Sequence, residues 1–324
     1  MKLLEVKESQ AYYYRSYSLP EENSSVTRAP IYFKIVTLAF AHQYNNFIHK
    51  NQSIFNFLFK LPTLPAGNYN LNLSGNVTLH SYHVGQGMCS LMHNGSEGFL
   101  IDCGAGTPIK QPGYKSLKNN QLIVDLNNLQ NVSMILSHFD SDHHRLLSWD
   151  SNILGKITNL YVPGNVTAGI IKDVNIHRII RPCISITINL DNGKLHAYRT
   201  NPHAYITKKN NNALISVINC NNKMYLLPGD YIYTMVAKDK NPQIKKLAGK
   251  SYAYVVVPHH GDKHSTNGIF APIDDSAIAY FSAGDNQGYL HPCPNSIKAH
   301  KNLKYQTVAD STNDQIDCSV TFNF

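Results

Sequence analysis

Charged side chains and long apolar runs are both scarce in this 324-residue chain. Charged residues make up 15% of the sequence, whereas apolar residues make up 43%, enough to bury a substantial core. That balance excludes a disordered chain. The longest apolar run near the N-terminus, residues 31–40, is too short to span a bilayer and is interrupted by Lys34. The first turns are charged and show no secretory signal, so we expect a cytoplasmic protein without a membrane partner.

The cysteines form no CxxC pair, which excludes a zinc-finger or thioredoxin-like site. Their wide scatter indicates a reducing compartment, in agreement with a cytoplasmic location. Cys103 and Cys220 lie in strand-like runs and are predicted to be small buried residues. The full set is Cys89, Cys103, Cys183, Cys220, Cys293 and Cys318.

Positive charge exceeds negative charge: 29 Lys and Arg face 21 Asp and Glu, which gives a formal net charge of +8. This excess favours a polyanionic partner, and nucleic acid is the obvious candidate. A generally basic proteome is the alternative explanation. We expect the lysines to form solvated surfaces unless the fold places them beside an active site. The densest group is Lys238, Lys240, Lys245, Lys246 and Lys250.

The pattern of the chain changes near residue 70. Residues 1–70 form an aromatic, loop-rich N-terminal extension of unknown function, and residues 61–67 carry two prolines and a glycine that mark a connector. In residues 71–324, short β-runs alternate with turns and helical segments, which predicts an α/β (α+β) sandwich. Strands are predicted at 77–84, 88–92, 99–102, 132–136, 160–162, 184–190, 214–219, 224–227, 254–257 and 277–282, and helices at 122–129, about 233–250 and 294–302.

The most unusual segment, residues 137–143, directly follows an apolar strand and contains His138, Asp140, Asp142 and His143. A strand end holds the backbone rigidly, and the turn that follows lets alternate side chains converge. Carboxylate oxygens and imidazole nitrogens together suit Zn²⁺, Mn²⁺ or Fe²⁺. The alternative is a polar turn whose side chains satisfy one another.

Three further strand ends carry histidine or aspartate. Asp230 ends the run 226–230, His259 and His260 follow the apolar run 255–257, and His291 follows a glycine-rich turn. Taken alone, Gly229-Asp230 could be an ordinary turn. A sandwich whose strand ends share one edge would bring all of these side chains together, so each motif supports the others.

The order of these motifs resembles that of a metallo-β-lactamase-fold hydrolase and is most similar to the hydrolase domain of the ComEC/Rec2 competence proteins. The resemblance rests on residues 84–87, 99–104, 138–143, 229–230, 259–261 and 288–292, and covers the chain from about residue 75 to the C-terminus. It implies a four-layer αββα sandwich with a metal site at one edge. Asp140 stands where the superfamily usually has a second histidine, as in the ComEC-like branch, which favours Mn²⁺ over an all-histidine zinc site.

The resemblance implies that two divalent metal ions, Mn²⁺ or Zn²⁺, activate a hydroxide that attacks a phosphodiester. His138 and Asp140 would bind the first ion, and Asp142 and His143 the second. Asp230 would bridge the two ions. Asp142 is therefore expected to be a catalytic residue as well as a ligand.

The remaining site residues have supporting roles in this interpretation. His259 would complete the ligand set, and His260 is either a ligand or a phosphate contact. His291 would donate a hydrogen bond to the phosphate or protonate the leaving oxygen, which is a catalytic role. Asp102 would hold the ligand cluster in place from behind.

The chain also departs from the usual pattern of the superfamily. His144-Arg145-Leu146 replace a Gly-Gly pair, Met88 replaces an aspartate, and Asp262 replaces a serine. These changes are expected to reshape the pocket without removing a ligand. A separate mid-chain histidine ligand is common in the wider superfamily. The candidates here are His177, His196 and His203, and each of them is more readily explained as a surface residue.

The leading prediction is a metal-dependent phosphodiesterase that cleaves DNA or RNA. One alternative is a hydrolase of a small phosphodiester, such as a cyclic nucleotide, or of another ester, which a narrow pocket closed by the N-terminal region would favour. The other is a non-catalytic binding protein on the same fold. The competence proteins join this domain to a membrane channel, and this sequence contains no such segment, so DNA uptake by this chain itself is not expected.

Overall fold

The structure is a computed structural model that describes residues 66–164, 179–202, 209–284, 288–309 and 315–324, together with two strands nearer the N-terminus. Those strands, β1 (Tyr13–Ser16) and β2 (Ile31–Lys34), pair antiparallel in a unit that spans residues 1–61. The other residues of the predicted N-terminal extension, up to residue 65, lie outside the described residues. The second unit, residues 62–324, contains β3 (Gly67–Asn72), which begins before the boundary expected near residue 70.

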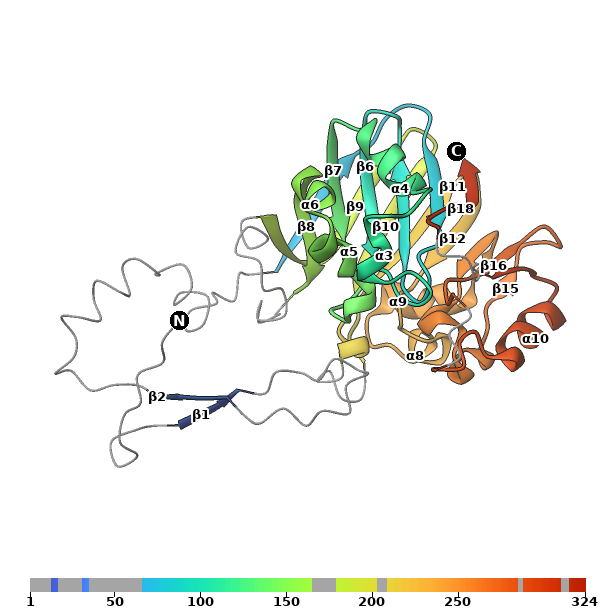
Figure 1. Ribbon diagram of the computed structural model, residues 1–324. Helices are drawn as coiled ribbons and strands as arrows, with labels where there is room; N and C mark the ends of the chain where they lie inside the picture. Colours follow the sequence, from blue (N-terminus) through green and yellow to red (C-terminus); the bar gives the residue numbers. More distant parts are fainter. Residues whose placement is uncertain are drawn as a thin grey trace. The chain divides into compact units, whose positions relative to one another are not determined.

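One mixed sheet of fourteen strands runs through the second unit (Figure 1). One half of the sheet contains, in spatial order, β18 (Cys318–Asn323), β4 (Thr78–Tyr82), β5 (Cys89–His93), β6 (Glu97–Cys103), β7 (Asn131–Ile135) and β8 (Ile157–Pro163). The other half contains β10 (Gly193–Arg199), β11 (Leu214–Cys220), β12 (Lys223–Leu227), β14 (Tyr254–Val256), β16 (Ile278–Phe281) and β17 (Gln306–Ala309). A separate parallel pair joins β13 (Ser251–Tyr252) to β15 (Ala271–Pro272).

The long strand β9 (Ile180–Leu190) joins the two halves of the sheet. Its first four residues pair with β8, and its residues from Ser185 onward pair with β10. β3 pairs with β9 beyond the end of β8. The chain thus passes from one half of the sheet to the other within a single strand.

Short helices cover the outer face of each half. On the first half these are α3 (Gln111–Tyr114), α4 (Gln121–Asn127), α5 (Arg145–Trp149) and α6 (Ser151–Lys156). On the second half they are α8 (Tyr233–Ala237), α9 (Pro242–Lys245) and α10 (Pro294–Asn302). Single 3₁₀ turns occur at η3 (Ser141–His143), η5 (Lys209–Asn211), η6 (Lys246–Gly249), η7 (Pro258–Gly261) and η8 (Lys263–Thr266).

Alternating side chains divide the interior into three apolar layers. Leu100 packs with Leu122 of α4 in the first outer core, whereas its neighbour Ile101 packs in the central core. In the second half, Leu226 packs toward the helices, and Leu227 packs in the same central core as Ile101. Strands buried on both faces are expected to be apolar almost throughout. The predicted four-layer αββα sandwich is therefore confirmed.

Buried hydroxyl groups connect the two halves across the central core. The Tyr254 hydroxyl donates to Oγ of Ser81 at 2.7 Å, and the Tyr280 hydroxyl donates to the carbonyl of Tyr82 at 2.8 Å. Nearer the site, Ser282 Oγ donates to the Gly87 carbonyl at 2.6 Å. These bonds satisfy polar groups that would be costly to bury alone, and they fix how the two halves face each other.

The single helix predicted over about 233–250 is wrong, because the segment forms α8, α9 and η6 instead. Proline disfavours helical backbone in the residue before it, and Asn241 is extended and caps α9 through a bond from the Gln243 amide. The sequence prediction also missed β3, β10, β17 and β18. Cys103 and Cys220 are buried as predicted, and all six cysteines are free thiols. None of the described helices is long and apolar enough to cross a membrane.

Candidate metal centre

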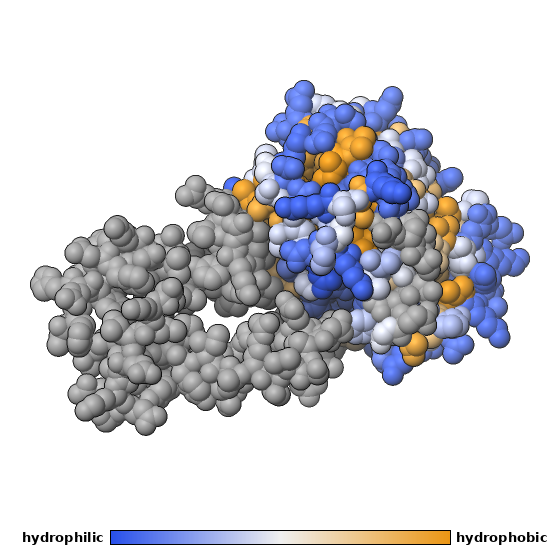
Figure 2. All heavy atoms as spheres, in the orientation of Figure 1, coloured by the Kyte–Doolittle hydropathy of each residue, from blue (hydrophilic) through white to orange (hydrophobic). Residues whose placement is uncertain are grey.

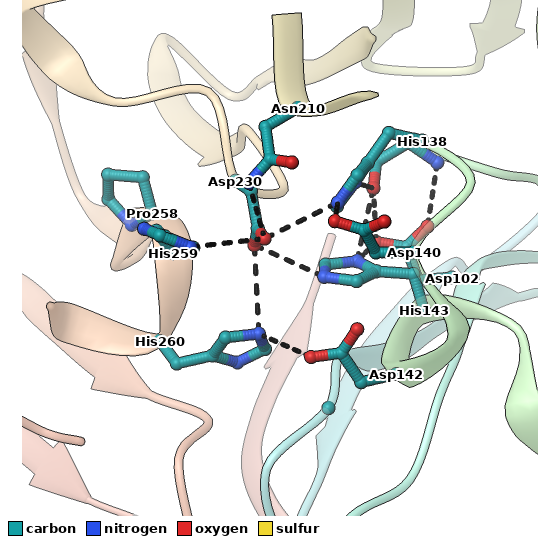
Figure 3. A network of polar contacts seen from close by, with 12 residues as sticks. Asp102, His138, Asp140, Asp142, His143, Asn210, Asp230, Pro258, His259 and His260 are labelled. Carbon is teal, nitrogen blue, oxygen red and sulfur yellow. Dashed lines mark hydrogen bonds and ion pairs between the residues drawn. The ribbon is translucent and has the colours of Figure 1, made fainter. Parts of the chain in front are cut away.

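The 137–143 turn follows the C-terminal end of β7, and its polar side chains point into the site (Figure 3). His138 and His143 are fully buried, with 0% exposure, although imidazoles are polar. Their rings lie 4.1 Å apart between centroids. Asp140 and Asp142 lie on the same turn, and Oδ2 of Asp140 is 3.5 Å from Nε2 of His138. The turn therefore converges on one point rather than satisfying itself locally.

Two glycine loops hold the backbone of this turn. The amide of Met88 donates to the carbonyl oxygen of Asp142 at 3.2 Å. A Cβ at position 87 would lie 2.7 Å from that oxygen, and a Cβ at position 104 would overlap it. Gly87 and Gly104 are thus required by the close approach of backbone to backbone. The glycine motifs at 85–87 and 104–106 position the turn that carries the ligand-type side chains.

Asp102 orients His143 from behind the site. Its Oδ1 accepts a bond from the Ser137 amide at 2.7 Å, and its Oδ2 accepts from Ser137 Oγ at 2.7 Å. The same Oδ2 lies 2.8 Å from Nδ1 of His143. A carboxylate accepts the proton on Nδ1, so Nε2 of His143 is left to face the site.

Asp230, at the end of β12, lies at the centre of the site. Its Oδ1 is 3.1 Å from Nε2 of His143, and its Oδ2 is 3.3 Å from Nε2 of His138. Asn210 of η5 donates to Oδ2 of Asp230 at 3.3 Å. Asp230 is 6% exposed, and positive φ at Gly229 lets the chain turn into the site beside Ser137. The two half-sheets therefore contribute to one centre.

The two adjacent histidines after β14 are placed differently. His260 is 1% exposed, its Nε2 lies 3.1 Å from Oδ2 of Asp142, and its Nδ1 donates to the Ser282 carbonyl at 2.8 Å. His259 has a side chain that is 34% exposed, and its Nε2 lies 3.7 Å from Oδ2 of Asp230. Nδ1 of His259 is 3.1 Å from Oδ2 of Asp262. The carbonyl of Ser282 accepts the proton on Nδ1 of His260, so Nε2 of this ring faces the site.

His291 lies at the rim of the site. Its ring is 5.7 Å from that of His259 and 6.1 Å from that of His260, between centroids, and Tyr289 stacks on it at 5.9 Å. His291 is neither among the buried ligand-type residues nor within ion-pair distance of a described carboxylate. His291 therefore lies beside the centre and belongs to neither of the residue groups that could hold a metal ion.

Strained backbone gathers around the site. Asp102, His259, His260 and Leu290 all have positive φ, between 51° and 60°. Non-glycine residues rarely adopt this conformation, and each instance costs on the order of 1–3 kcal/mol. Such strain persists where the surrounding structure requires it, and it is concentrated at functional sites.

The charges in the centre stabilise one another. Burial alone would lower the pKa of His143, but Asp230 and Asp102 raise it well above its usual value. Burial alone would raise the pKa of Asp230, and the histidines around it hold that pKa well below its usual range. The pKa of Asp142 is likewise lowered by His260 and His143 against the effect of burial.

The two outer histidines have pKa values shifted in opposite directions. Burial alone would lower the pKa of His259, but Asp262 and Asp230 raise it to about 9. Burial, His260 and His259 lower the pKa of His291 to about 4.

The residues present fit divalent cations. Among the described residues, Nε2 of His138, His143 and His260 and Oδ1 of Asp230 are buried and form no hydrogen bond of good geometry, although carboxylate oxygens lie 3.1 to 3.3 Å from the three nitrogens. Buried polar atoms without hydrogen bonds are costly, and bound metal ions would satisfy these atoms. Among the described residues, two groups could hold a metal ion: His138, His143 and Asp230 form one, and Asp142, His143 and His260 form the other.

This arrangement differs in detail from the predicted division of ligands. His143 belongs to both groups, and Asp140 contacts His138 without belonging to either. His196, one of the mid-chain candidates, lies on β10 against Thr187 and joins neither group. The other candidates, His177 and His203, lie outside the described residues.

Sequence reasoning missed several residues that shape the site. Ser137 is hydrogen-bonded to Asp102 and lies within 3.2 Å of Nδ1 of both His138 and His143. Asn210 and Ser282 contact the centre from segments without a recognisable motif. Only Ser137 had a signal, since it adjoins the cluster in the sequence.

Arg145, which replaces a glycine of the usual pattern, ties the turn to the neighbouring loop. It donates to the Ala105 carbonyl at 3.0 Å and to Ser141 Oγ at 2.7 Å, and its guanidinium lies 5.9 Å from the ring centroid of Trp149. The side chain therefore supports the turn and does not enter the centre.

Comparison with known proteins gives one curated relative and several structural neighbours. The chain is 25% identical over 223 residues to the competence protein ComA of Neisseria gonorrhoeae, and the match covers 68% of this chain and 29% of ComA. CmlA, a diiron β-hydroxylase from Streptomyces venezuelae, is 14% identical with a TM-score of 0.41 and covers 78% of this chain and 54% of its own. The metallo-β-lactamase fold protein YhfI from Bacillus subtilis is 10% identical with a TM-score of 0.40 and covers 77% of this chain and 100% of its own. No protein-family model matches the chain.

Proposed function

We propose that this protein is a metal-dependent phosphodiesterase and that its substrate is DNA or RNA. One observation carries the proposal: buried Nε2 atoms of His138, His143 and His260, none of which forms a hydrogen bond of good geometry, converge on the buried carboxylate of Asp230. A structural polar network would satisfy its own members. A set of donors left open toward one point, at the edge of a sandwich, is what a catalytic metal centre requires.

Two ions would be held by these residues. His138 and Asp230, with Asp140 beside them, would hold one, and Asp142 and His260 would hold the other. His143 belongs to both groups, but its Nε2 carries one lone pair and would bind only one of the two ions. When bound, two divalent ions supply a nucleophilic water at neutral pH and stabilise negative charge on the phosphoryl oxygens. The mix of carboxylate and imidazole ligands suits Mn²⁺ or Zn²⁺.

The side chains around the ligands fix their geometry before substrate arrives. Asp102 and Ser137 hold the ring of His143, and the Ser282 carbonyl holds that of His260. His291, at the rim, would donate a hydrogen bond to a nonbridging phosphate oxygen or to the leaving oxygen. Preorganised donors of this kind reduce the reorganisation that the transition state requires.

The substrate class follows from charge and from similarity. The net charge of +8 favours a polyanion, and the sequence similarity to a competence protein supports nucleic acid. The match covers only 29% of ComA, so the similarity concerns that part of ComA and not the activity of the whole protein.

The test compares the wild type with Asp142→Asn on labelled single- and double-stranded DNA and RNA, a cyclic nucleotide and bis(4-nitrophenyl) phosphate, in Mn²⁺ or Zn²⁺. We expect the wild type to cleave nucleic acid and the variant to lose at least about 100-fold in kcat/KM, because a ligand that is also near the reacting atoms is removed. Asp275→Asn, at an exposed carboxylate outside the site, is the control and should keep full activity.

Two results would contradict the proposal. One is a wild-type protein that binds metal but cleaves none of these substrates, and the other is equal cleavage by Asp142→Asn. Cleavage of the cyclic nucleotide alone would instead establish the small-phosphodiester alternative. If metal analysis found no ion bound under saturating Mn²⁺ or Zn²⁺, a non-catalytic binding role would replace both.

A further inference from the structure

Two elements that begin at the site carry exposed lysines. η8 starts three residues after His260, and its first residue, Lys263, is exposed. α10 begins at Pro294, three residues after His291, and carries exposed Lys298 and Lys301. Hydrophilic residues cover the side of the molecule on which α10 lies, at the right of Figure 2.

η8 and α10 form one packed surface. The Cys293 amide donates to the Gly261 carbonyl at 2.8 Å, and Ser296 Oγ donates to the Ser265 carbonyl at 3.5 Å. Ser296 and His300 are 0% exposed and mark the inner side of α10. With about 3.6 residues per turn, Lys298 and Lys301 project from the opposite side of the helix, roughly 4.5 Å apart along its axis. The three lysines are therefore carried by two elements that are joined to each other and that begin three residues after His260 and His291.

The positive charge on this side is not neutralised locally. Residues 231–309 contain nine lysines and five aspartates, a net charge of +4, whereas residues 66–164 contain five basic and six acidic residues, a net charge of −1. Two of the five aspartates, Asp239 and Asp262, are buried and bonded within the fold. Within the described part of the chain, none of Lys263, Lys298 and Lys301 forms an ion pair with a carboxylate.

We infer that Lys263, Lys298 and Lys301, here called the lysine face, hold the phosphate backbone of the nucleic acid next to the phosphodiester in the metal centre. The inference rests on the proposed function and adds the surface over which the substrate runs. Unpaired ammonium groups replace the counterions that phosphates otherwise condense, which provides binding energy without reading sequence.

The experiment compares the full-length wild type with two triple variants. Lys263→Gln/Lys298→Gln/Lys301→Gln removes the lysine face. Lys110→Gln/Lys115→Gln/Lys118→Gln is the matched control, because it removes the same charge from exposed positions near α3 in the first half. Affinity for a labelled 20-nucleotide DNA is measured by fluorescence anisotropy in EDTA between 50 and 300 mM NaCl, and cleavage of the same DNA and of bis(4-nitrophenyl) phosphate is measured in Mn²⁺.

We expect the lysine-face variant to bind DNA about tenfold or more weakly. The slope of log K against log salt should become shallower by about 2, because each phosphate contact contributes about 0.7 on a single strand. KM for DNA should rise, whereas hydrolysis of bis(4-nitrophenyl) phosphate, which is too small to reach the lysines, should stay at the wild-type level. The control variant should change neither slope nor KM.

An unchanged slope, or an equal change in the control variant, would overturn the inference. These outcomes are separate from a failure of the proposed function. If the wild type cleaves DNA and the lysine-face variant cleaves and binds it equally well, the nuclease stands and the lysine face does not. If the wild type cleaves nothing but binds DNA through these lysines, the surface stands and the nuclease does not.

Discussion

The two halves of the sandwich supply the centre in different ways. The first half contributes one continuous turn, residues 137–143, whose backbone is clamped by the glycines at 87 and 104. The second half contributes side chains from separate loops that follow strands, at Asp230 after β12 and at His259 and His260 after β14. The comparison shows that the residues of a contiguous motif are close in space because they are close in the sequence, whereas dispersed residues are brought together only by the fold.

His260 and His259 give the most direct test of this contrast, since they are adjacent in the sequence but placed differently. We expect His260→Gln to lower kcat/KM by more than about 100-fold and to lose one metal ion per chain, because its buried Nε2 faces Asp142. His259→Gln should lower kcat/KM by only about tenfold and keep both ions, because this ring is partly exposed and paired with Asp262. Metal content by mass spectrometry and steady-state kinetics measure both effects. Loss of metal in His259→Gln alone would reverse the assignment.

Gly104→Ala tests whether the clamp on the first half sets the geometry of the turn. The added Cβ would overlap the carbonyl oxygen of Asp142, and neither backbone can move without disturbing β6 or the turn. We expect the free energy of unfolding to fall by about 2 kcal/mol or more, as in other overpacked interiors. Gly113→Ala, where a Cβ meets nothing within 4 Å, is the control and should be neutral or slightly stabilising. Urea unfolding measures both, and equal stability of the two variants would contradict the role given to the clamp.

A third prediction concerns a buried histidine of the second half that lies outside the centre. His300 donates from Nδ1 to the Ser296 carbonyl at 2.8 Å and lies 3.0 Å from the Tyr233 hydroxyl. Burial lowers the pKa of His300 to about 4, below the usual 6.5 of an unfolded chain. Between these values the unfolded state binds a proton that the folded state does not, so this contribution to stability is present above pH 6.5 and is lost as the pH falls toward 4.

The measurement is the difference between wild type and His300→Gln in urea unfolding at pH 6 and pH 5. Between pH 6 and pH 5, the free energy of unfolding of the wild type should fall by about 1 kcal/mol more than that of the variant, because only the wild type carries the histidine. Other titrating groups are common to both proteins and cancel in the difference. Parallel loss of stability in the two proteins would show that His300 is not held neutral in the folded state.

Much of the fold follows from patterns of apolar residues. The runs at 132–136 and 254–257 are short, apolar and bounded by turns, and they form β7 and β14. β17 and β18 lie at the two edges of the main path of the sheet, where one side of the strand is unpaired and burial is incomplete, so their apolar signal is weaker. The break between α8 and α9 depends on Pro242, whose effect competes with helical spacing over the whole segment.

Part of the site could also be predicted from the sequence. His138, Asp140, Asp142 and His143 are close in the sequence and therefore close in space. The choice between His259 and His260 depends on φ near +50° at both residues and on the Ser282 carbonyl from another strand. Asn210 reaches Asp230 from a segment with no motif. Contacts set by tertiary packing leave no local signal in a single sequence.

β9 limits how far the two half-sheets can separate from each other. This strand is hydrogen-bonded to β8 at one end and to β10 at the other. Neither half-sheet can therefore detach without breaking the backbone hydrogen bonds between β9 and one of these strands. Partial opening that separated the 137–143 turn from Asp230 would then require nearly the free energy of global unfolding. The amide protons of the buried residues Ile186 and Ile188 of β9, which pair with both β10 and β3, should consequently be among the last to exchange with solvent, and the centre should stay assembled for as long as the sandwich does.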